Sequence, residues 1–189
     1  MKAQLQLTQL LALAILLTSA TSNLGATTLP DQPYAAITAV SGTNPEAEAY
    51  LSKGAQLMAE RRYTAARRAY KAAAELLRAD GKLPVEPLRR IADAYYFEGR
   101  YQSAAATLDH LAGEAATYGD LATEVWALAD AAWVDAVAGH KIDMERRLQR
   151  LMRLLDSPYL PDEVRGEVQA KRLRGVPTGQ MVAATSGSH

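Results

Sequence analysis

The amino-acid sequence predicts an all-α fold in which about three antiparallel helix pairs stack side by side and a further helix covers the C-terminal end. The composition favours this fold, because the chain is rich in alanine and has only 12 glycines and 8 prolines in 189 residues. The chain also repeats itself, since the apolar or small residues from Tyr50 to Ala73 align with those from Leu88 to Leu111. A period in the thirties is typical of helical repeat proteins, whose core forms by stacking of the units.

The spacing within the repeats predicts how each pair of helices meets. Gly54 and Ala92 are each followed, at intervals of 9, 12, 16 and 19, by aromatic, small or apolar residues. These are Tyr63, Ala66, Tyr70 and Ala73 in the first unit, and Tyr101, Ala104, Leu108 and Leu111 in the second. We expect the small residue to allow close approach of the two helices, the tyrosine to fill the corner, and the later residues to form one stripe.

A third unit, in which Leu128 aligns with Leu88 of the second, fits less well. Six residues keep the register, namely Leu128, Ala132, Gly139, Met144, Leu148 and Leu151. Asp135 and Lys141, however, stand where the pattern expects tyrosine. The packing of this unit is therefore expected to depart from that of the first two.

The repeats resemble the tetratricopeptide repeat family over residues 47–111. The first unit carries the family pattern in Tyr50, Gly54, Leu57, Tyr63, Ala66, Tyr70 and Ala73. The second carries it in Leu88, Ile91, Ala92, Tyr95, Gly99, Tyr101 and Ala104, with Leu108 where the family usually has an aromatic residue. The resemblance implies a right-handed solenoid whose first helices line a concave binding surface, and a binding platform rather than an enzyme.

Signals for helix ends agree with the repeats. Asn44 precedes Pro45 and an acidic first turn, which predicts a helix start, and Asp80 with Gly81 predicts a stop before a restart at Pro84. The expected helices span 45–60, 64–79, 85–98, 102–117, 120–138 and 143–156. A charged helix over 161–174, with Val164, Val168 and Leu173 as its apolar stripe, is expected to cap the stack.

Residues 1–26 have the order of a secretory signal peptide. A charge at Lys2 and an apolar run over 10–17 precede small polar residues. The run has about eight residues, whereas a helix needs roughly 20 to cross a bilayer. We therefore expect cleavage after Ala20 or Ala26, a periplasmic or secreted protein, and no stable membrane insertion afterwards; a short hydrophobic helix kept on the protein is the alternative.

The rest of the chain divides by composition into three parts. Residues 27–43 mix threonine, proline, glycine and serine, which predicts a linker. Residues 44–174 carry the repeats and form the helical domain. Residues 175–189 are expected to be a disordered tail.

Little in the sequence points to catalysis. Cysteine is absent, which excludes disulfides, thiol nucleophiles and cysteine-rich metal sites. The glycines occur singly, and neither HExxH nor GxSxG is found. His110, His140 and His189 are expected to be solvated surface residues. We therefore expect a protein that is not an enzyme and uses neither a cofactor nor a metal ion.

The charges sum to zero but are unevenly placed. Because 21 basic residues balance 21 acidic ones, the basic field of a nucleic-acid binder is missing. Between Arg100 and Lys141 there are six acidic residues and no lysine or arginine, and arginine-rich blocks lie on both sides. These blocks are expected to be solvated helix faces that attract neighbouring units. Alternatively, they bind anionic envelope polymers or lipid head groups.

The predicted binding site lies on the first helices of the units. Its candidate residues are Met58 from the first unit, Arg89, Arg90, Tyr96 and Phe97 from the second, and Trp126 and Trp133 from the third. The two tryptophans are seven residues apart and so share one side of their helix. Either they anchor a partner or the chain itself covers them, through the last helix or through residues 34–40. We expect a non-catalytic scaffold of a bacterial-type cell envelope that binds a mixed apolar and anionic segment of another protein or peptide.

Overall fold

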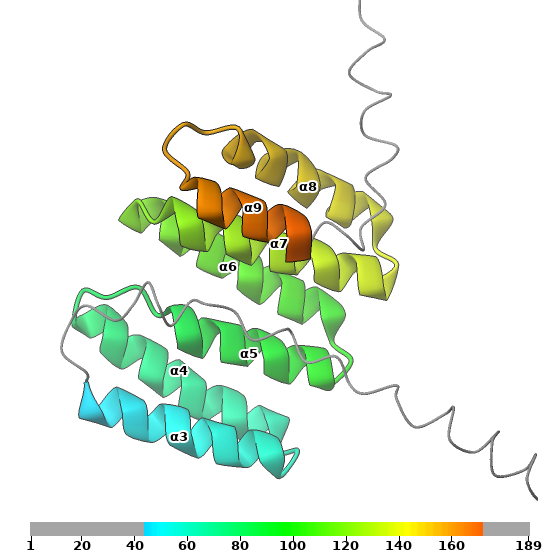
Figure 1. Cartoon of the computed structure of the whole chain (residues 1–189). Helices are drawn as coiled ribbons and strands as arrows, with labels where there is room; N and C mark the ends of the chain where they lie inside the picture. Colours follow the sequence, from blue (N-terminus) through cyan, green and yellow to red (C-terminus); the bar gives the residue numbers. More distant parts are fainter. Residues whose placement is uncertain (1–43, 172–189) are drawn as a thin grey trace, which may run out of the picture. The chain divides into compact units, whose positions relative to one another are not determined.

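The computed structural model describes residues 44–171, and this part of the chain contains seven α-helices and no strand (Figure 1). The helices are α3 (Pro45–Ala59), α4 (Tyr63–Ala79), α5 (Val85–Phe97), α6 (Tyr101–Tyr118), α7 (Leu121–Ala138), α8 (Lys141–Leu155) and α9 (Asp162–Lys171). The bounds expected for the first six are confirmed to within two residues. The predicted signal peptide (1–26), linker (27–43) and tail (175–189) lie outside the described residues.

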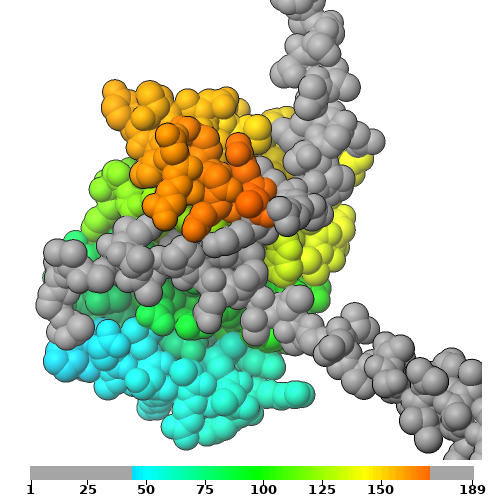
Figure 2. All heavy atoms as spheres, in the orientation of Figure 1, coloured from blue at the N-terminus to red at the C-terminus, as the bar shows by residue number. Residues whose placement is uncertain are grey.

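Each helix from α3 to α8 packs against the next one along the chain, and consecutive helices run in opposite directions (Figure 1). The final helix, α9, turns back and packs against α7. In Figure 2 the orange atoms of α9 also lie against those of α8, where Arg165 Nε donates a 2.8 Å hydrogen bond to the carbonyl of Leu155. The predicted all-α fold of stacked helix pairs with a capping helix is therefore confirmed.

The five turns between α3 and α8 share one geometry. Each contains a residue with φ between 57° and 76°, in the left-handed region; these residues are Arg61, Gly81, Gly99, Gly119 and Gly139. In the first turn the amide of Arg61 donates to the carbonyl of Met58 and that of Arg62 to the carbonyl of Leu57, both at 2.9 Å. The other four turns repeat this pair of bonds, which closes the end of a helix. The repeat seen in the sequence thus relates turns as well as helices.

The stripe predicted from the repeat spacing forms the core. Its members on α4, α6 and α8 are buried, including Tyr70, Leu108 and Leu148. Tyr70, Leu111 and Leu148 share one hydrophobic cluster with Leu88 of α5 and Leu128 of α7. The expected start of the first helix is also confirmed, because Asn44 Oδ1 accepts hydrogen bonds from the amides of Glu46 and Ala47 at 3.1 Å. Local signals and long-range packing therefore agree over the described residues.

Candidate functional site

Three of the seven predicted binding residues come together in one aromatic cluster. The ring of Tyr96 lies 5.7 Å from that of Phe97 and 5.6 Å from that of Trp133, measured between ring centroids. Two corner tyrosines complete the cluster: Tyr101 lies 5.5 Å from Tyr96, and Tyr63 stacks on Phe97 at 6.4 Å. All five side chains are half-buried. The sequence pattern found these tyrosines as corner residues but did not place them beside the predicted anchors.

Trp126 does not lie on an open surface, so for this tryptophan the alternative that the chain itself covers it holds. Its side chain is 1% exposed and belongs to the main hydrophobic cluster. The physical reason is the position of α7, which packs against α6, α8 and α9 and buries residues on all its sides. A residue seven positions away on the same helix, Trp133, escapes full burial only near the C-terminal end of α7.

The two candidate arginines also differ from each other. The side chain of Arg89 is 13% exposed, and its Nε lies 3.9 Å from Asp130 of α7, whose side chain is fully buried. Arg89 therefore faces a buried carboxylate of its own chain. Arg90 remains exposed and pairs along its own helix with Glu86 and Asp93, at 3.6 and 3.7 Å.

Met58, the candidate from the first unit, is half-buried and packs against the edge of the hydrophobic core. It belongs to α3, and none of the ring contacts of the aromatic cluster involves that helix. The seven predicted residues therefore do not form one continuous surface.

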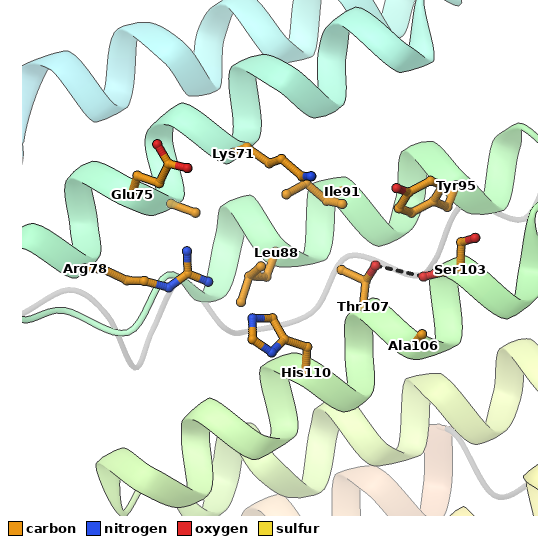
Figure 3. A pocket seen from close by; sticks show the side chains of 11 residues that line it. Lys71, Glu75, Arg78, Leu88, Ile91, Tyr95, Ser103, Ala106, Thr107 and His110 are labelled. Carbon is orange, nitrogen blue, oxygen red and sulfur yellow. Dashed lines mark hydrogen bonds between the residues drawn. The ribbon is translucent and has the colours of Figure 1, made fainter.

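The described residues instead form a pocket of about 520 Å3 between α4 and α6, with α5 beneath it (Figure 3). Eleven residues line this α4–α6 pocket: Lys71, Ala74, Glu75, Arg78, Leu88, Ile91, Tyr95, Ser103, Ala106, Thr107 and His110. None of the seven predicted binding residues is among them. The sequence did hold a signal, because Ser103, Ala106 and Thr107 place small side chains on one face of α6 and so leave room there.

The floor of the pocket is apolar and its rim is mainly basic. Leu88 and Ile91 come up from α5, and Figure 3 shows Lys71 and Arg78 reaching toward them while the carboxylate of Glu75 turns away. Tyr95 closes one end, where the guanidinium carbon of Arg67 lies 4.3 Å from the centroid of its ring. The pocket thus combines apolar contact with cationic and hydroxyl groups, as ligand sites commonly do.

One acidic residue holds two of the basic side chains at the rim. Glu114 accepts hydrogen bonds from Arg78 Nε at 3.2 and 3.3 Å, and its Oε1 lies 2.8 Å from His110 Nε2. The negative charge of Glu114 is therefore shared between two basic groups. Lys71 takes part in none of the ion pairs between residues 44 and 171.

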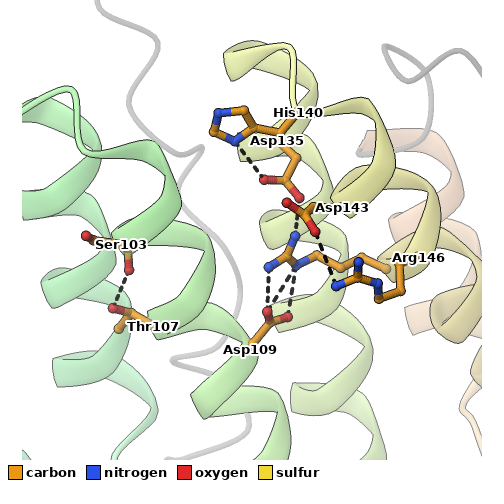
Figure 4. Close-up of polar contacts among 8 residues, drawn as sticks. Ser103, Thr107, Asp109, Asp135, His140, Asp143 and Arg146 are labelled. Atoms are coloured by element: carbon orange, nitrogen blue, oxygen red, sulfur yellow. Dashed lines mark hydrogen bonds and ion pairs between the residues drawn. The ribbon is translucent and has the colours of Figure 1, made fainter.

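The next gap along the stack, between α6 and α8, is bridged by charge (Figure 4). Asp109, which the repeat aligns with Lys71, accepts a 3.0 Å hydrogen bond from Arg147 Nε. Arg147 also donates to Asp135, the residue that replaces the expected tyrosine of the third unit. Within the described residues, Arg78 and Glu114 join α4 to α6, and no ion pair joins these helices at the level of Lys71.

Burial governs the charges of this α6–α8 bridge. Burial raises the pKa of the Asp135 carboxyl, and the charge of Arg147 and the hydrogen bond with His140 counteract only part of that effect. The pKa of Arg147 is raised because the hydrogen bond and charge of Asp109 outweigh the opposing effect of burial. These side chains therefore act as a structural ion pair that fills the place of an aromatic ring.

Two of the three histidines lie within the described residues. His110 is 60% exposed and sits at the rim of the α4–α6 pocket, while His140 Nδ1 lies 3.5 Å from the buried Asp135. The solvated surface expected for both is thus confirmed only for His110. His189 lies outside the described residues. Within residues 44–171, no group of three or more histidine, aspartate or glutamate side chains is placed to hold a metal ion.

Comparison of the chain with family models, with curated proteins and with solved structures finds no match. None of the helices between residues 44 and 171 combines the length and the apolar character needed to cross a bilayer.

Proposed function

We propose that this chain is a non-catalytic scaffold of the cell envelope that binds another protein or a peptide, and that the α4–α6 pocket receives part of the partner. The observation that carries the proposal is the pocket itself. Its volume of about 520 Å3 falls within the range of roughly 300–1,000 Å3 typical of ligand sites. Because three consecutive helices line it, the pocket exists only where two helix pairs stack.

Two sequence features support the same proposal. The repeats resemble the tetratricopeptide family, whose members are binding platforms far more often than enzymes, an argument by analogy. The envelope location depends on the leader expected over residues 1–26. Tyr96, Phe97, Trp133, Arg90 and Met58 remain predicted partner contacts.

The alternative function, binding of anionic polymers or lipid head groups through arginine-rich faces, is weakened by the ion pairs. Arg67 pairs with Glu98 at 2.8 Å, Arg147 with Asp109 and Asp135, and Arg150 with Glu124 at 2.6 Å. Several arginines of these blocks thus already form ion pairs with carboxylates of other helices or turns, and this leaves fewer of them to bind an anionic ligand. The two hypotheses also differ in their response to salt, because screening weakens exposed charge contacts much more than apolar ones.

Site-specific crosslinking in the native host tests the proposal. A photoreactive amino acid replaces Ala106, which lines the pocket, or Ala116, which is exposed on the same helix but does not line it. We expect a discrete crosslinked protein with the probe at position 106 and none at position 116, and a purified complex of the two proteins that survives raised salt. Equal adducts at both positions, or none at position 106, would contradict the proposal.

A further inference from the structure

Resting on the proposed function, we infer that the partner segment in the α4–α6 pocket is an acidic amphipathic helix, with its apolar stripe on the pocket floor and its carboxylates toward α4. Two parallel helices with a gap between them form a groove, and an amphipathic helix binds such a groove through apolar residues at intervals of three and four. The pocket offers small side chains on α6 and an apolar floor on α5, which suits such a stripe.

Charge at the rim selects the acidic class of partner. Along α4, Arg68, Lys71 and Arg78 recur at helical spacing, and Glu75 is the only acidic residue among the pocket lining. Its carboxylate turns away from the floor in Figure 3. Glu114, outside the lining, is already engaged by Arg78 and His110. Among the lining residues two cations, Lys71 and Arg78, stand against the single carboxylate of Glu75, and because Arg78 is paired with Glu114, Lys71 is the cation left to meet a carboxylate of a partner.

Lys71 is the basic side chain of the pocket that is placed to meet a carboxylate of the partner. It is exposed, lines the pocket, and makes no ion pair within residues 44–171. At the aligned position in the next gap, Asp109 is joined by Arg147 of the neighbouring helix, at 3.0 Å. A carboxylate of the partner beside Lys71 would therefore form an ion pair equivalent to that of Asp109 and Arg147. It would join two chains instead of two helices, and the acidic and basic positions would be exchanged.

The chain offers a matched control for each contact. Lys53 on α3 is also an exposed lysine without an ion pair among the described residues, but it does not line the pocket. Ala116 and Ala106 are both exposed on α6, and only Ala106 lines the pocket. All four side chains are exposed, so their replacement should leave the fold intact, which circular dichroism checks.

The experiment uses the full chain and a displayed library of helical peptides. Every peptide has a leucine stripe at intervals of three and four, and the flanking positions vary among glutamate, lysine and glutamine. We expect enrichment of peptides with glutamate flanks. Binding of the best one, measured by fluorescence anisotropy, should weaken at least about tenfold with Lys71→Glu and with Ala106→Phe. Lys53→Glu and Ala116→Phe should change it by less than about twofold.

Enrichment of lysine or glutamine flanks, no enrichment, or equal losses in the control variants would overturn the inference. The crosslinking experiment separates this failure from that of the proposed function. If a partner is captured at position 106 but the library shows no preference for glutamate, the proposed scaffold function is supported. Only the inference that the bound segment is an acidic helix is then rejected.

Discussion

The α-carbon of Gly54 lies so close to the ring of Tyr70 that any side chain at position 54 would force the ring to move. A Cβ built on Gly54 would lie 2.6 Å from Cδ1 and 2.7 Å from Cζ of Tyr70, well inside van der Waals contact. The ring is itself 1% exposed and held within the core. The first helix pair is therefore joined by a glycine that fits against an aromatic ring, as the repeat spacing predicted.

Gly54→Ala is expected to destabilise the fold by about 1–3 kcal/mol, because the added methyl group must displace a buried ring. Gly113→Ala is the matched control. Gly113 also lies inside a helix, but its added Cβ would meet nothing within 4 Å, so alanine should stabilise the fold by up to about 1 kcal/mol. Chemical denaturation of both variants measures the difference. Equal effects would show that the close approach is not what selects glycine at position 54.

Tyr70 should also limit stability at high pH. Burial raises the pKa of its phenol from 10.0 to about 12, so between these values the unfolded chain loses this proton and the native protein keeps it. Stability therefore falls as pH rises through this window, by roughly 2–3 kcal/mol from this group. Tyr70→Phe should remove that part of the alkaline loss, measured as the free energy of unfolding at pH 9 and 12, values chosen as roughly flanking the window. An unchanged pH dependence would contradict the assignment.

Arg61 occupies the left-handed position that glycine holds in the four other turns between α3 and α8. Its φ of 57° costs a residue with a side chain roughly 1 kcal/mol or more. Arg61→Gly is thus expected to raise the melting temperature, since Arg61 is exposed and little is lost with its side chain. Gly99→Ala, at the equivalent turn, should lower it. Thermal unfolding that moves the other way in either variant would rule out backbone strain as the cause.

The two tryptophans are expected to differ in what they stabilise. Trp126→Ala removes a fully buried indole and should cost about 3–5 kcal/mol of stability. Trp133→Ala should cost clearly less, because Trp133 is half-buried and contacts Tyr96 at the edge of the aromatic cluster. Denaturation curves and partner binding are measured for both. If Trp133→Ala unfolds the protein as readily as Trp126→Ala does, the aromatic cluster is core and not a contact surface.

Arg147→Met should destabilise the fold by about 3–5 kcal/mol, because it leaves the buried carboxylate of Asp135 without its cation. Adding Asp135→Asn should recover part of this loss, since the uncompensated charge is then gone. Arg146→Met is the control: Arg146 is exposed and pairs with Asp143 at 3.2 Å, so its loss should change stability by less than about 1 kcal/mol. Similar costs for both arginines would show that burial does not govern the pair.

The helices and their packing stripe could be predicted from the sequence because both depend on local periodicity and on caps such as Asn44. The site could not be predicted to the same extent. Periodicity tells which side of a helix is apolar, but not which neighbour covers it, so Trp126 and Arg89 looked accessible. The α4–α6 pocket depends on the distance between two units, and that distance follows from side-chain sizes on three helices together. Ser103 and Ala106 line a pocket only because the fold places them opposite Lys71 and Leu88, which the sequence alone does not show.

The ion pairs between units also fix the order in which the units follow one another. Arg78 reaches Glu114 across 36 residues, and Arg147 reaches Asp109 across 38, so the carboxylates of α6 receive a guanidinium from the unit on either side. A second copy of the middle unit, inserted directly after the original, would place an aspartate, the second copy of Asp109, where Arg147 now meets Asp109. Duplicating a unit would therefore not lengthen the stack without further substitutions, because the charged residues differ from one junction between units to the next.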